Sequence, residues 1–248
     1  MRGASAVGLR EQLAEKGDWV PVSEPASVLP RTALRLVDSA ANVGSRAAGN
    51  ASRYRLAKRA MDLVLSILLL VLLAPFLIVV ALAIRLDSSG AALFHQWRVG
   101  LGGKQFRIWK FRTLTVAEDG DDIAQVRKAD PRVTRVGRIL RRASLDELPQ
   151  LINVLRGEMS LVGPRPHARA HDYYFAKRIE NYALRQTVKP GMTGWAQING
   201  LRGETATLEE MSRRVGFDVW YAGQATFGLD LRILLATPRA VLLGRNAW

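Results

Sequence analysis

The hydrophobic residues of the chain are concentrated in one long stretch. From Leu63 to Ile84 the sequence reads LVLSILLLVLLAPFLIVVALAI, with Ser66 as the only polar side chain and Pro75 as the only helix breaker. A helix of this length matches a hydrocarbon core about 30 Å thick. More than sixty residues precede the stretch and no small-residue cleavage pattern follows it, so it is not a cleavable signal peptide. The pattern therefore predicts a membrane helix rather than the core helix of a soluble protein.

The residues alone leave the path of this helix open. Positive charges stand on both sides of it, so the positive-inside rule favours neither orientation and both ends are predicted to be cytoplasmic. Pro75 lies near the middle and permits a sharp bend, which fits a re-entrant helix that returns to the same face. A spanning helix that tolerates its proline fits equally well. The flanking charges are Arg53, Arg55, Lys58 and Arg59 before the stretch, and Arg85, Arg98, Lys104 and Arg107 after it.

A β-hairpin is predicted directly after the membrane stretch. The segment ALFHQWRVGLGGKQFRIWKFRT holds two short runs of aromatic, aliphatic and β-branched residues. Glycines 100, 102 and 103 separate the runs, as in a hairpin with a glycine loop. In the second run Phe106, Ile108 and Lys110 share one face. Residues 1–52 show no sustained periodicity and are predicted to form a flexible cytoplasmic extension that is largely disordered or weakly helical.

Two later segments have the pattern of basic amphipathic helices. Between Arg132 and Arg142, apolar residues recur at helical spacing and arginines occupy the remaining positions. A second candidate runs from Leu229 to Leu243, with Pro238 as a bend. Basic amphipathic helices suit an anionic membrane interface, and the long apolar stretch in the same chain favours this over nucleic-acid binding.

Composition narrows the partners and the chemistry. The 248 residues suit one main domain, and 36 Lys and Arg against 22 Asp and Glu give a formal charge of +14 and a pI near 10.9. Such a charge calls for a polyanionic partner: nucleic acid, an anionic membrane or a phosphorylated substrate. The absence of cysteine excludes disulfides and thiolate chemistry. An acidic loop with Glu118, Asp119, Asp121 and Asp122 lacks EF-hand spacing and is predicted to be solvated.

The segment RASLDELPQL carries two adjacent carboxylates, Asp146 and Glu147, after a run of arginines. One interpretation needs no chemistry: Ser144 and Glu147 have capping-box spacing, so both acids would sit in the first turn of a helix, with Pro149 tolerated there. The other interpretation is a reactive site. A carboxylate near several arginines should be ionised, and is then a competent nucleophile or metal ligand.

Two glycine- and proline-rich segments downstream favour the reactive site. Gly163, Pro164, Arg165 and Pro166 form a rigid turn that holds one guanidinium at a fixed angle, as phosphate binding requires. The segment VKPGMTGWAQINGLRGE permits close backbone approach to a ligand. Together they predict an anion site, for which Mg²⁺ with one or two carboxylates and substrate oxygens is the expected metal. Polar and glycine positions of that second segment are Lys189, Gly191, Gly194, Gln197, Asn199 and Arg202.

These motifs resemble the bacterial sugar transferases of the monotopic phosphoglycosyltransferase superfamily. The resemblance covers Arg53 to Trp248 and rests on KRAMDLVLSILLLVLLAPFLI, FHQWRVGLGGKQFRIWKFRTL, RASLDELPQLINVLRGEMSLVGPRP and VKPGMTGWAQINGLRGE. It implies transfer of a sugar 1-phosphate from a UDP-sugar to undecaprenyl phosphate with release of UMP, in exopolysaccharide or capsule initiation. INGLRGE resembles members that transfer glucose or galactose 1-phosphate.

The resemblance also implies roles for individual residues. Asp146 would attack the β-phosphate to form a phosphosugar-enzyme intermediate, Glu147 would support the site, and both would bind Mg²⁺, or Mn²⁺ in its place. A re-entrant helix bent at Pro75 is a further implied feature, although Ala74 replaces a serine often found before that proline. YAGQATFGLDLRIL also departs from the family pattern. The implied substrate-binding residues are Lys110, Arg112, Arg141, Pro164, Arg165, Pro166, Gln197 and Arg202.

The expected fold is α/β but mostly helical: a monotopic membrane protein with amphipathic interfacial helices and a small cytosolic catalytic domain that contains a β-hairpin. The expected parts are an extension (1–52), a re-entrant helix (53–90) and the catalytic domain (91–248). The expected location is the cytoplasmic face of a bacterial inner membrane, with membrane lipid, a second copy of the chain and downstream glycosyltransferases as candidate partners and no nucleic acid. Two rivals are a membrane-anchored basic scaffold that binds nucleic acid and an inactive member of the transferase fold. Adjacent acids cannot easily flank a glycosidic bond, which disfavours a glycosidase.

Overall fold

The computed structural model describes residues 45–115, 130–203, 205 and 207–243. Its longest element is helix α3 (Ser45–Asp87), which contains Pro75. Within the described residues, Ala51–Asp87 is the one segment long and apolar enough to cross a membrane, and only 11% of its apolar window is buried, unlike a soluble core helix. The helix begins inside the segment predicted to be a flexible extension. Residues 1–44 and the acidic loop lie outside the described residues.

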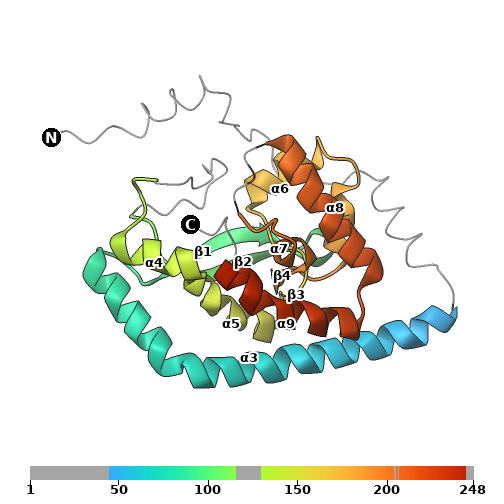
Figure 1. Cartoon of the computed structure of the whole chain (residues 1–248), viewed down its shortest axis with the longest axis horizontal. Helices are drawn as coiled ribbons and strands as arrows, with labels where there is room; N and C mark the ends of the chain where they lie inside the picture. Colours follow the sequence, from blue (N-terminus) through green and yellow to red (C-terminus); the bar gives the residue numbers. More distant parts are fainter. Residues whose placement is uncertain (1–44, 116–129, 204, 206, 244–248) are drawn as a thin grey trace.

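Both ends of α3 are attached to the same body. Figure 1 shows α3 passing along one side of the remaining elements and changing direction between its two arms. Near its start, Arg59 donates to the carbonyl oxygens of Val154 and Leu155 at 2.6 and 2.8 Å. Near its end, the backbone N–H of Val136 donates to Asp87 at 2.9 Å. The middle exposes apolar side chains: Val64, Ile67, Leu68, Val71, Leu72, Phe76, Ile78, Val79 and Leu82.

The predicted hairpin is present. Strands β1 (Leu93–Val99) and β2 (Gln105–Phe111) pair antiparallel, with the turn η1 (Leu101–Gly103) between them. Gly102 and Gly103 have φ values of +61° and +79°, which a residue without Cβ adopts at little cost. The register of this hairpin places the face of β2 that bears Lys110 toward the helical body, where η2 contacts it.

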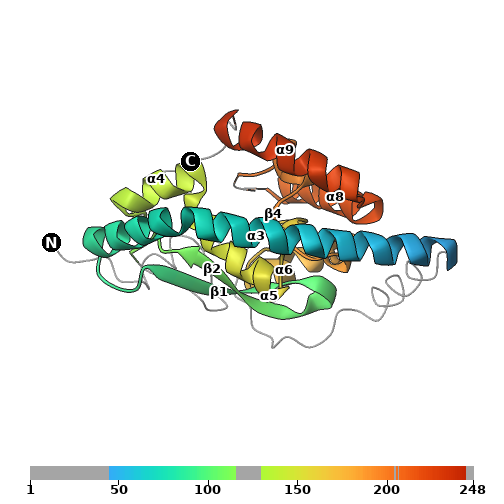
Figure 2. The same cartoon turned by 90° about the horizontal axis from the view of Figure 1, so that it is seen from below.

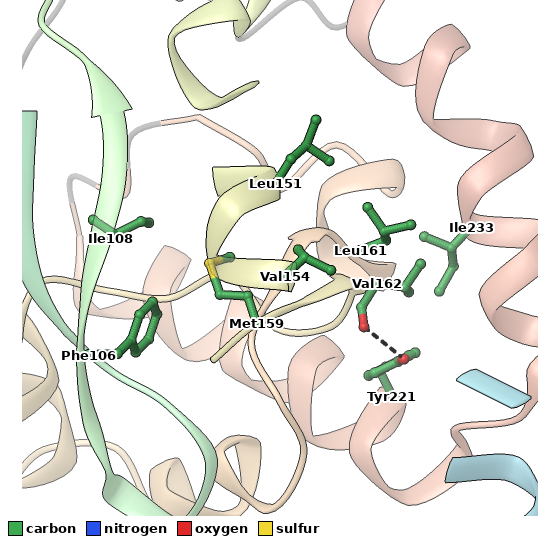
Figure 3. Packing of buried hydrophobic residues seen from close by; sticks show 9 residues of the cluster. All are labelled: Phe106, Ile108, Leu151, Val154, Met159, Leu161, Val162, Tyr221 and Ile233. Atoms are coloured by element: carbon green, nitrogen blue, oxygen red, sulfur yellow. Dashed lines mark hydrogen bonds between the residues drawn. The ribbon is translucent and has the colours of Figure 1, made fainter. Parts of the chain in front are cut away.

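A second, two-stranded parallel sheet lies deeper in the body. Strand β3 (Ser160–Val162) pairs with β4 (Gly191–Thr193). Gly163 and Gly191 approach so closely that a Cβ on Gly191 would lie 2.0 Å from the backbone nitrogen of Gly163. Figure 3 shows the main hydrophobic cluster between the hairpin and α9, with the Tyr221 hydroxyl donating to the Val162 carbonyl at 3.3 Å. The cluster is Phe106, Ile108, Leu151, Val154, Met159, Leu161, Val162, Tyr221 and Ile233.

Helices make up most of the remaining body, as expected. The first predicted amphipathic helix begins at Arg135 rather than Arg132 because Thr134 caps it, accepting from the N–H of Gly137 at 2.9 Å. The second begins two residues earlier than predicted. Figure 2 shows the underside of the body, crossed by α3. The helical elements are α4 (Arg135–Ala143), η2 (Leu145–Gln150), α5 (Leu151–Arg156), α6 (Arg169–Ala176), η3 (Tyr182–Thr187), α7 (Trp195–Ile198), α8 (Leu208–Gln224) and α9 (Phe227–Leu243).

Candidate active site

The two carboxylates lie in the short 3₁₀ helix η2, directly after α4. Ser144 joins the two helices with a φ of +52° and makes no side-chain capping bond. The capping-box interpretation is therefore right that both acids lie in the first turn of a helix that follows Ser144, but its hydrogen bonds are absent. The Ser144 hydroxyl instead accepts a hydrogen bond from Arg202, and the Glu147 side chain faces β2. Asp146 and Glu147 are 7% and 8% exposed. Burying two adjacent carboxylates is unfavourable unless cations or ligands compensate, which points to a functional site.

Glu147 is paired with two cations. Its Oε1 accepts from Lys110 Nζ at 2.8 Å, and Arg165 reaches both oxygens, with Nη1 to Oε2 at 2.9 Å and Nη2 to Oε1 at 2.5 Å. Burial opposes ionisation of this carboxyl, but the charges and hydrogen bonds of Arg165 and Lys110 outweigh it and hold its pKa well below the ordinary value. Glu147 is thus a fixed anion that holds two cationic side chains in place.

Asp146 is in a different state from its neighbour. Burial, and next the negative charge of Glu147, raise its pKa, while Lys110, Arg141 and Arg165 oppose the rise. In the described part of the chain, no side chain donates a hydrogen bond to its carboxylate. The expectation of a fully ionised carboxylate among arginines therefore fits Glu147 better than Asp146. An ionised Asp146 would be poorly stabilised by its surroundings, as suits a nucleophile.

The turn that carries Arg165 is held in place by hydrogen bonds to its backbone carbonyls. The Gly191 N–H donates to the Pro164 carbonyl at 2.9 Å, and Arg98 donates to the Pro166 carbonyl at 3.2 Å. Between them, Arg185 Nη2 donates to the carbonyl of Arg165 itself at 2.5 Å. With three consecutive carbonyls bound and two prolines restricting φ, the turn fixes the direction of the Arg165 side chain.

A buried charged cluster behind this turn could not be recognised in the sequence. Asp218 Oδ2 accepts from Arg185 at 3.0 Å (Nε) and 2.8 Å (Nη2), and Asp172 lies 3.6 Å from the same guanidinium. Burial raises the pKa of Asp172 to about 6 against the opposing charge of Arg185. These residues come from the consecutive elements α6 and η3 and from the more distant α8, so no local motif joins all three. The one available signal is Asp218, a charged residue between the apolar Phe217 and Val219.

The other predicted residues divide into two groups. Arg141 and Arg202 lie within electrostatic reach of both acids. Gln197 donates to the Met192 carbonyl at 3.0 Å and lines the backbone next to Gly194. Arg112 is placed elsewhere: its guanidinium binds the carbonyls of Ser88 and Ser89 at the end of α3 and has no contact with the dyad among the described hydrogen bonds. It fixes the membrane helix to β2.

The residues that could hold a metal are few. Among the described residues, no group of three or more His, Asp or Glu side chains converges on one point. No side chain in the described ranges donates to the carboxylate of Asp146, whereas both oxygens of Glu147 already face cations. Mg²⁺ characteristically takes only one or two carboxylates and completes its shell with substrate phosphates and water. Asp146 fits that mode, and Glu147 fits it less well than the sequence suggested.

Comparison with known proteins assigns the family. Residues 53–244 match the family model described as bacterial sugar transferase. The chain belongs to that family. It is 55% identical over 193 residues to a UDP-glucose:undecaprenyl-phosphate glucose-1-phosphate transferase of Caulobacter vibrioides, covering 78% of this chain and 72% of that protein. A protein of the same name from Escherichia coli is 54% identical over 183 residues, covering 74% of this chain and 39% of that protein.

A third relative has a different name. The exopolysaccharide production protein PSS of Rhizobium leguminosarum is 46% identical over 184 residues, covering 73% of this chain and 92% of that protein. The sugar transferase thus corresponds to almost the whole PSS protein but to well under half of the Escherichia coli relative. The family model begins at residue 53 and ends at 244, so the shared part contains all of α3 except its first eight residues, together with the dyad, the Arg165 turn and α9.

Proposed function

We propose that this sugar transferase moves a hexose 1-phosphate, glucose 1-phosphate in the first instance, from a UDP-hexose to undecaprenyl phosphate and releases UMP. The names of the relatives from Caulobacter vibrioides and Escherichia coli support the donor and the acceptor. The observation that carries the proposal is a buried Asp146 that accepts no hydrogen bond from the described side chains, beside a Glu147 that binds Lys110 and Arg165. Galactose 1-phosphate is the alternative cargo.

The proposed reaction has two displacements at one phosphorus. A carboxylate oxygen of Asp146 attacks the β-phosphorus of the UDP-hexose. The new bond forms as the bond from that phosphorus to the bridging oxygen breaks, and the electron pair leaves with UMP. An oxygen of undecaprenyl phosphate then attacks the same phosphorus, the aspartyl oxygen leaves as carboxylate, and undecaprenyl diphosphate hexose is formed. Two easier steps replace one direct transfer between two anions.

The surrounding residues supply charge and position. Arg165 presents a planar donor fork on a fixed turn, which suits the oxygens of a phosphate. Lys110, held by Glu147, adds a point charge from the neighbouring strand. Mg²⁺, or Mn²⁺, would be held by Asp146 together with the diphosphate oxygens and would neutralise phosphate charge. Because the cations are already fixed, little reorganisation is needed as charge moves from Asp146 to UMP.

The attachment of α3 supports a monotopic arrangement at the cytoplasmic face of the inner membrane. Arg59 binds the body near the start of the helix, and Arg112 and Val136 bind it near the end. A straight spanning helix would place these two attachments on opposite sides of the bilayer. A helix that enters and returns, bent near Pro75, keeps the whole body on one side and brings the dyad to the level of the acceptor phosphate.

The activity can be tested with the purified full chain in detergent or nanodiscs. With Mg²⁺, undecaprenyl phosphate and a panel of UDP-sugars, we expect UMP release, fastest with UDP-glucose. Asp146→Asn should lower the rate by at least about 10³-fold because an amide is a poor nucleophile. Arg142→Gln, an exposed change close to the dyad, is the matched control and should retain activity. Near-normal turnover by Asp146→Asn would remove the nucleophile assignment.

A further inference from the structure

Arg214 is a buried cation that no part of the proposed reaction uses. It lies on α8, is 5% exposed, and donates through Nη2 to the backbone carbonyl of Gly203. Asp218, one turn further along α8, would be its natural partner, but the ion pair of Asp218 is with Arg185. Among the described side chains, no carboxylate lies within ion-pair distance of Arg214. Burying a guanidinium with one neutral acceptor is costly and calls for an anion that binds there.

Comparison with Arg185 shows how unusual this environment is. Both arginines are about equally buried. Burial opposes the charge of Arg185, but Asp218, Tyr182 and Asp172 outweigh it and raise its pKa. At Arg214, burial and next the positive charge of Arg165 lower the pKa to about 10. Asp218 and Glu210 oppose this fall but do not outweigh it. Arg185 is therefore neutralised by a direct ion pair, whereas at Arg214 burial and the charge of Arg165 outweigh the nearby carboxylates.

Arg202 and Arg214 each carry a buried N–H donor that no described residue accepts. Arg214 Nε and Arg202 Nη1 are buried and have no hydrogen-bond partner among the described residues. Arg202 also donates to Ser144, two residues before Asp146, so its guanidinium is beside the dyad. Arg214 binds the carbonyl of Gly203, the residue that follows Arg202. Arg202 is thus beside the dyad, and Arg214 is bound to the residue that follows Arg202 and lies within electrostatic reach of Arg165, the cation paired with Glu147.

We propose that Arg214, together with Arg202, binds a substrate phosphate other than the one that is transferred. The inference rests on the proposed function. Guanidinium groups bind phosphate oxygens through two parallel N–H donors, and a dianionic phosphate would neutralise the repulsion between Arg214 and Arg165. The ligand is a phosphate monoester or diester, either the phosphate that leaves in UMP or the phosphate of the polyprenyl acceptor. A hydroxyl or a base would not compensate the charge.

The test measures equilibrium binding, so it does not depend on turnover. The full chain is purified in detergent as wild type, Arg214→Gln, Arg214→Lys and Arg213→Gln. Arg213 precedes Arg214 on α8 but is exposed, so Arg213→Gln removes the same charge from the surface. Dissociation constants are measured for UMP and uridine, and for farnesyl phosphate and farnesol. Thermal melting shows whether each variant is folded.

We expect Arg214→Gln to weaken binding of UMP or of farnesyl phosphate by about 10- to 100-fold, the loss of a charged hydrogen bond, and to leave uridine and farnesol unchanged. Arg214→Lys should lose less, and Arg213→Gln should bind like the wild type. Weakening for UMP assigns the donor phosphate, and weakening for farnesyl phosphate assigns the acceptor phosphate. Wild-type affinity of Arg214→Gln for both phosphates, or equal weakening for uridine and UMP, would overturn the inference.

The outcome is separable from that of the proposed function. If the wild type releases no UMP from any UDP-sugar, yet Arg214→Gln weakens UMP binding selectively, the phosphate site stands and the transferase proposal falls. If the wild type is an active transferase and Arg214→Gln binds both phosphates normally, the transferase proposal stands. Arg214 would then only anchor the segment after Arg202.

Discussion

At the residue scale, the site separates two carboxylates that are neighbours in sequence. Glu147 is paired with two cationic side chains, and its pKa is lowered. Asp146 is about equally buried, but its pKa is raised, and no described side chain donates a hydrogen bond to it. The structure therefore stabilises the anion of Glu147, which binds Lys110 and Arg165, more than that of Asp146, as the proposed nucleophilic role of Asp146 requires. Such a site is expected to lower the stability of the fold in exchange for reactivity.

The two acids should have opposite effects on stability. Because the pKa of Asp146 is raised in the folded state, its ionisation disfavours folding at pH values above the ordinary Asp pKa of about 3.9. Asp146→Asn removes this ionisation and should therefore raise the melting temperature near neutral pH. This gain should shrink as pH falls toward about 4, where Asp is ordinarily protonated. The measurement is thermal melting of the detergent-solubilised chain at several pH values. A lower melting temperature of Asp146→Asn near neutral pH would contradict the account.

Glu147→Gln should destabilise the fold. The lowered pKa of Glu147 gives stability that is present above the ordinary Glu value of about 4.3 and is lost as pH falls through the folded pKa. Removing one partner of a buried ion pair costs on the order of 3 kcal/mol. The variant should melt below the wild type near neutral pH and approach it in acid. Equal melting at all pH values would mean that the pairs with Lys110 and Arg165 contribute nothing.

The rate should also depend on pH through Asp146. Only the ionised carboxyl attacks phosphorus, and its pKa is raised, so kcat/KM for the UDP-sugar should fall as pH drops while the pH is still above the ordinary Asp value of about 3.9. UMP release measured at low substrate concentration reports this titration in the free enzyme. A rate that stays constant down to about pH 4 would show that the carboxyl is not the group that titrates.

At the element scale, the sequence predicted most of the helices and the hairpin, but not the backbone conformation between α4 and η2 or the pairing of β3 with β4. The hairpin, the apolar helix and the two amphipathic helices follow from periodicity and glycine placement. The capping-box spacing predicted a helix after Ser144, where η2 lies, but not the positive φ of Ser144 or the loss of the capping bonds. Nor could the sequence predict that β3 and β4 pair in parallel to support the Arg165 turn, since they are separated by about thirty residues and each is three residues long.

Close packing of two glycines supports that turn, and a pair of substitutions tests it. A Cβ at Gly191 would lie 2.0 Å from the Gly163 nitrogen, so Gly191→Ala should disrupt the turn and cost several kcal/mol, with loss of activity. Gly223→Ala adds the same methyl group within α8, where nothing lies within 4 Å, and should stabilise by about 0.5 to 1 kcal/mol. Thermal melting and UMP release distinguish the two. A fully active, stable Gly191→Ala variant would contradict the packing argument.

At the scale of the whole molecule, the membrane helix and the catalytic body form one unit. The positive charges on both sides of the apolar helix favour neither orientation, so the sequence left a re-entrant and a spanning path open. The contacts of Arg59 and Arg112 with the body, which no sequence pattern indicated, favour the re-entrant path. The candidate site was predicted at Asp146, Glu147 and Arg165, whose motifs are local. Arg185, Asp218 and Arg214 were not, because their importance depends on contacts between distant elements.

The path of the helix can be measured directly because the chain contains no cysteine. Arg55→Cys and Ala91→Cys place one thiol at an exposed position near each end of α3. A membrane-impermeant maleimide should label both variants from the cytoplasmic side of inner-membrane vesicles and neither from the periplasmic side. Labelling of the two thiols from opposite sides would establish a spanning helix.

In the proposed reaction the Asp146 carboxyl becomes covalently attached to the sugar phosphate. The most direct measurement is mass spectrometry of the peptide that contains residues 145–150, after the chain is mixed with UDP-glucose and Mg²⁺ without acceptor and rapidly quenched. The account predicts that this peptide carries one added hexose phosphate on Asp146, and that added undecaprenyl phosphate removes it. An adduct on another residue, or UMP release that occurs only with acceptor and without any adduct, would contradict it.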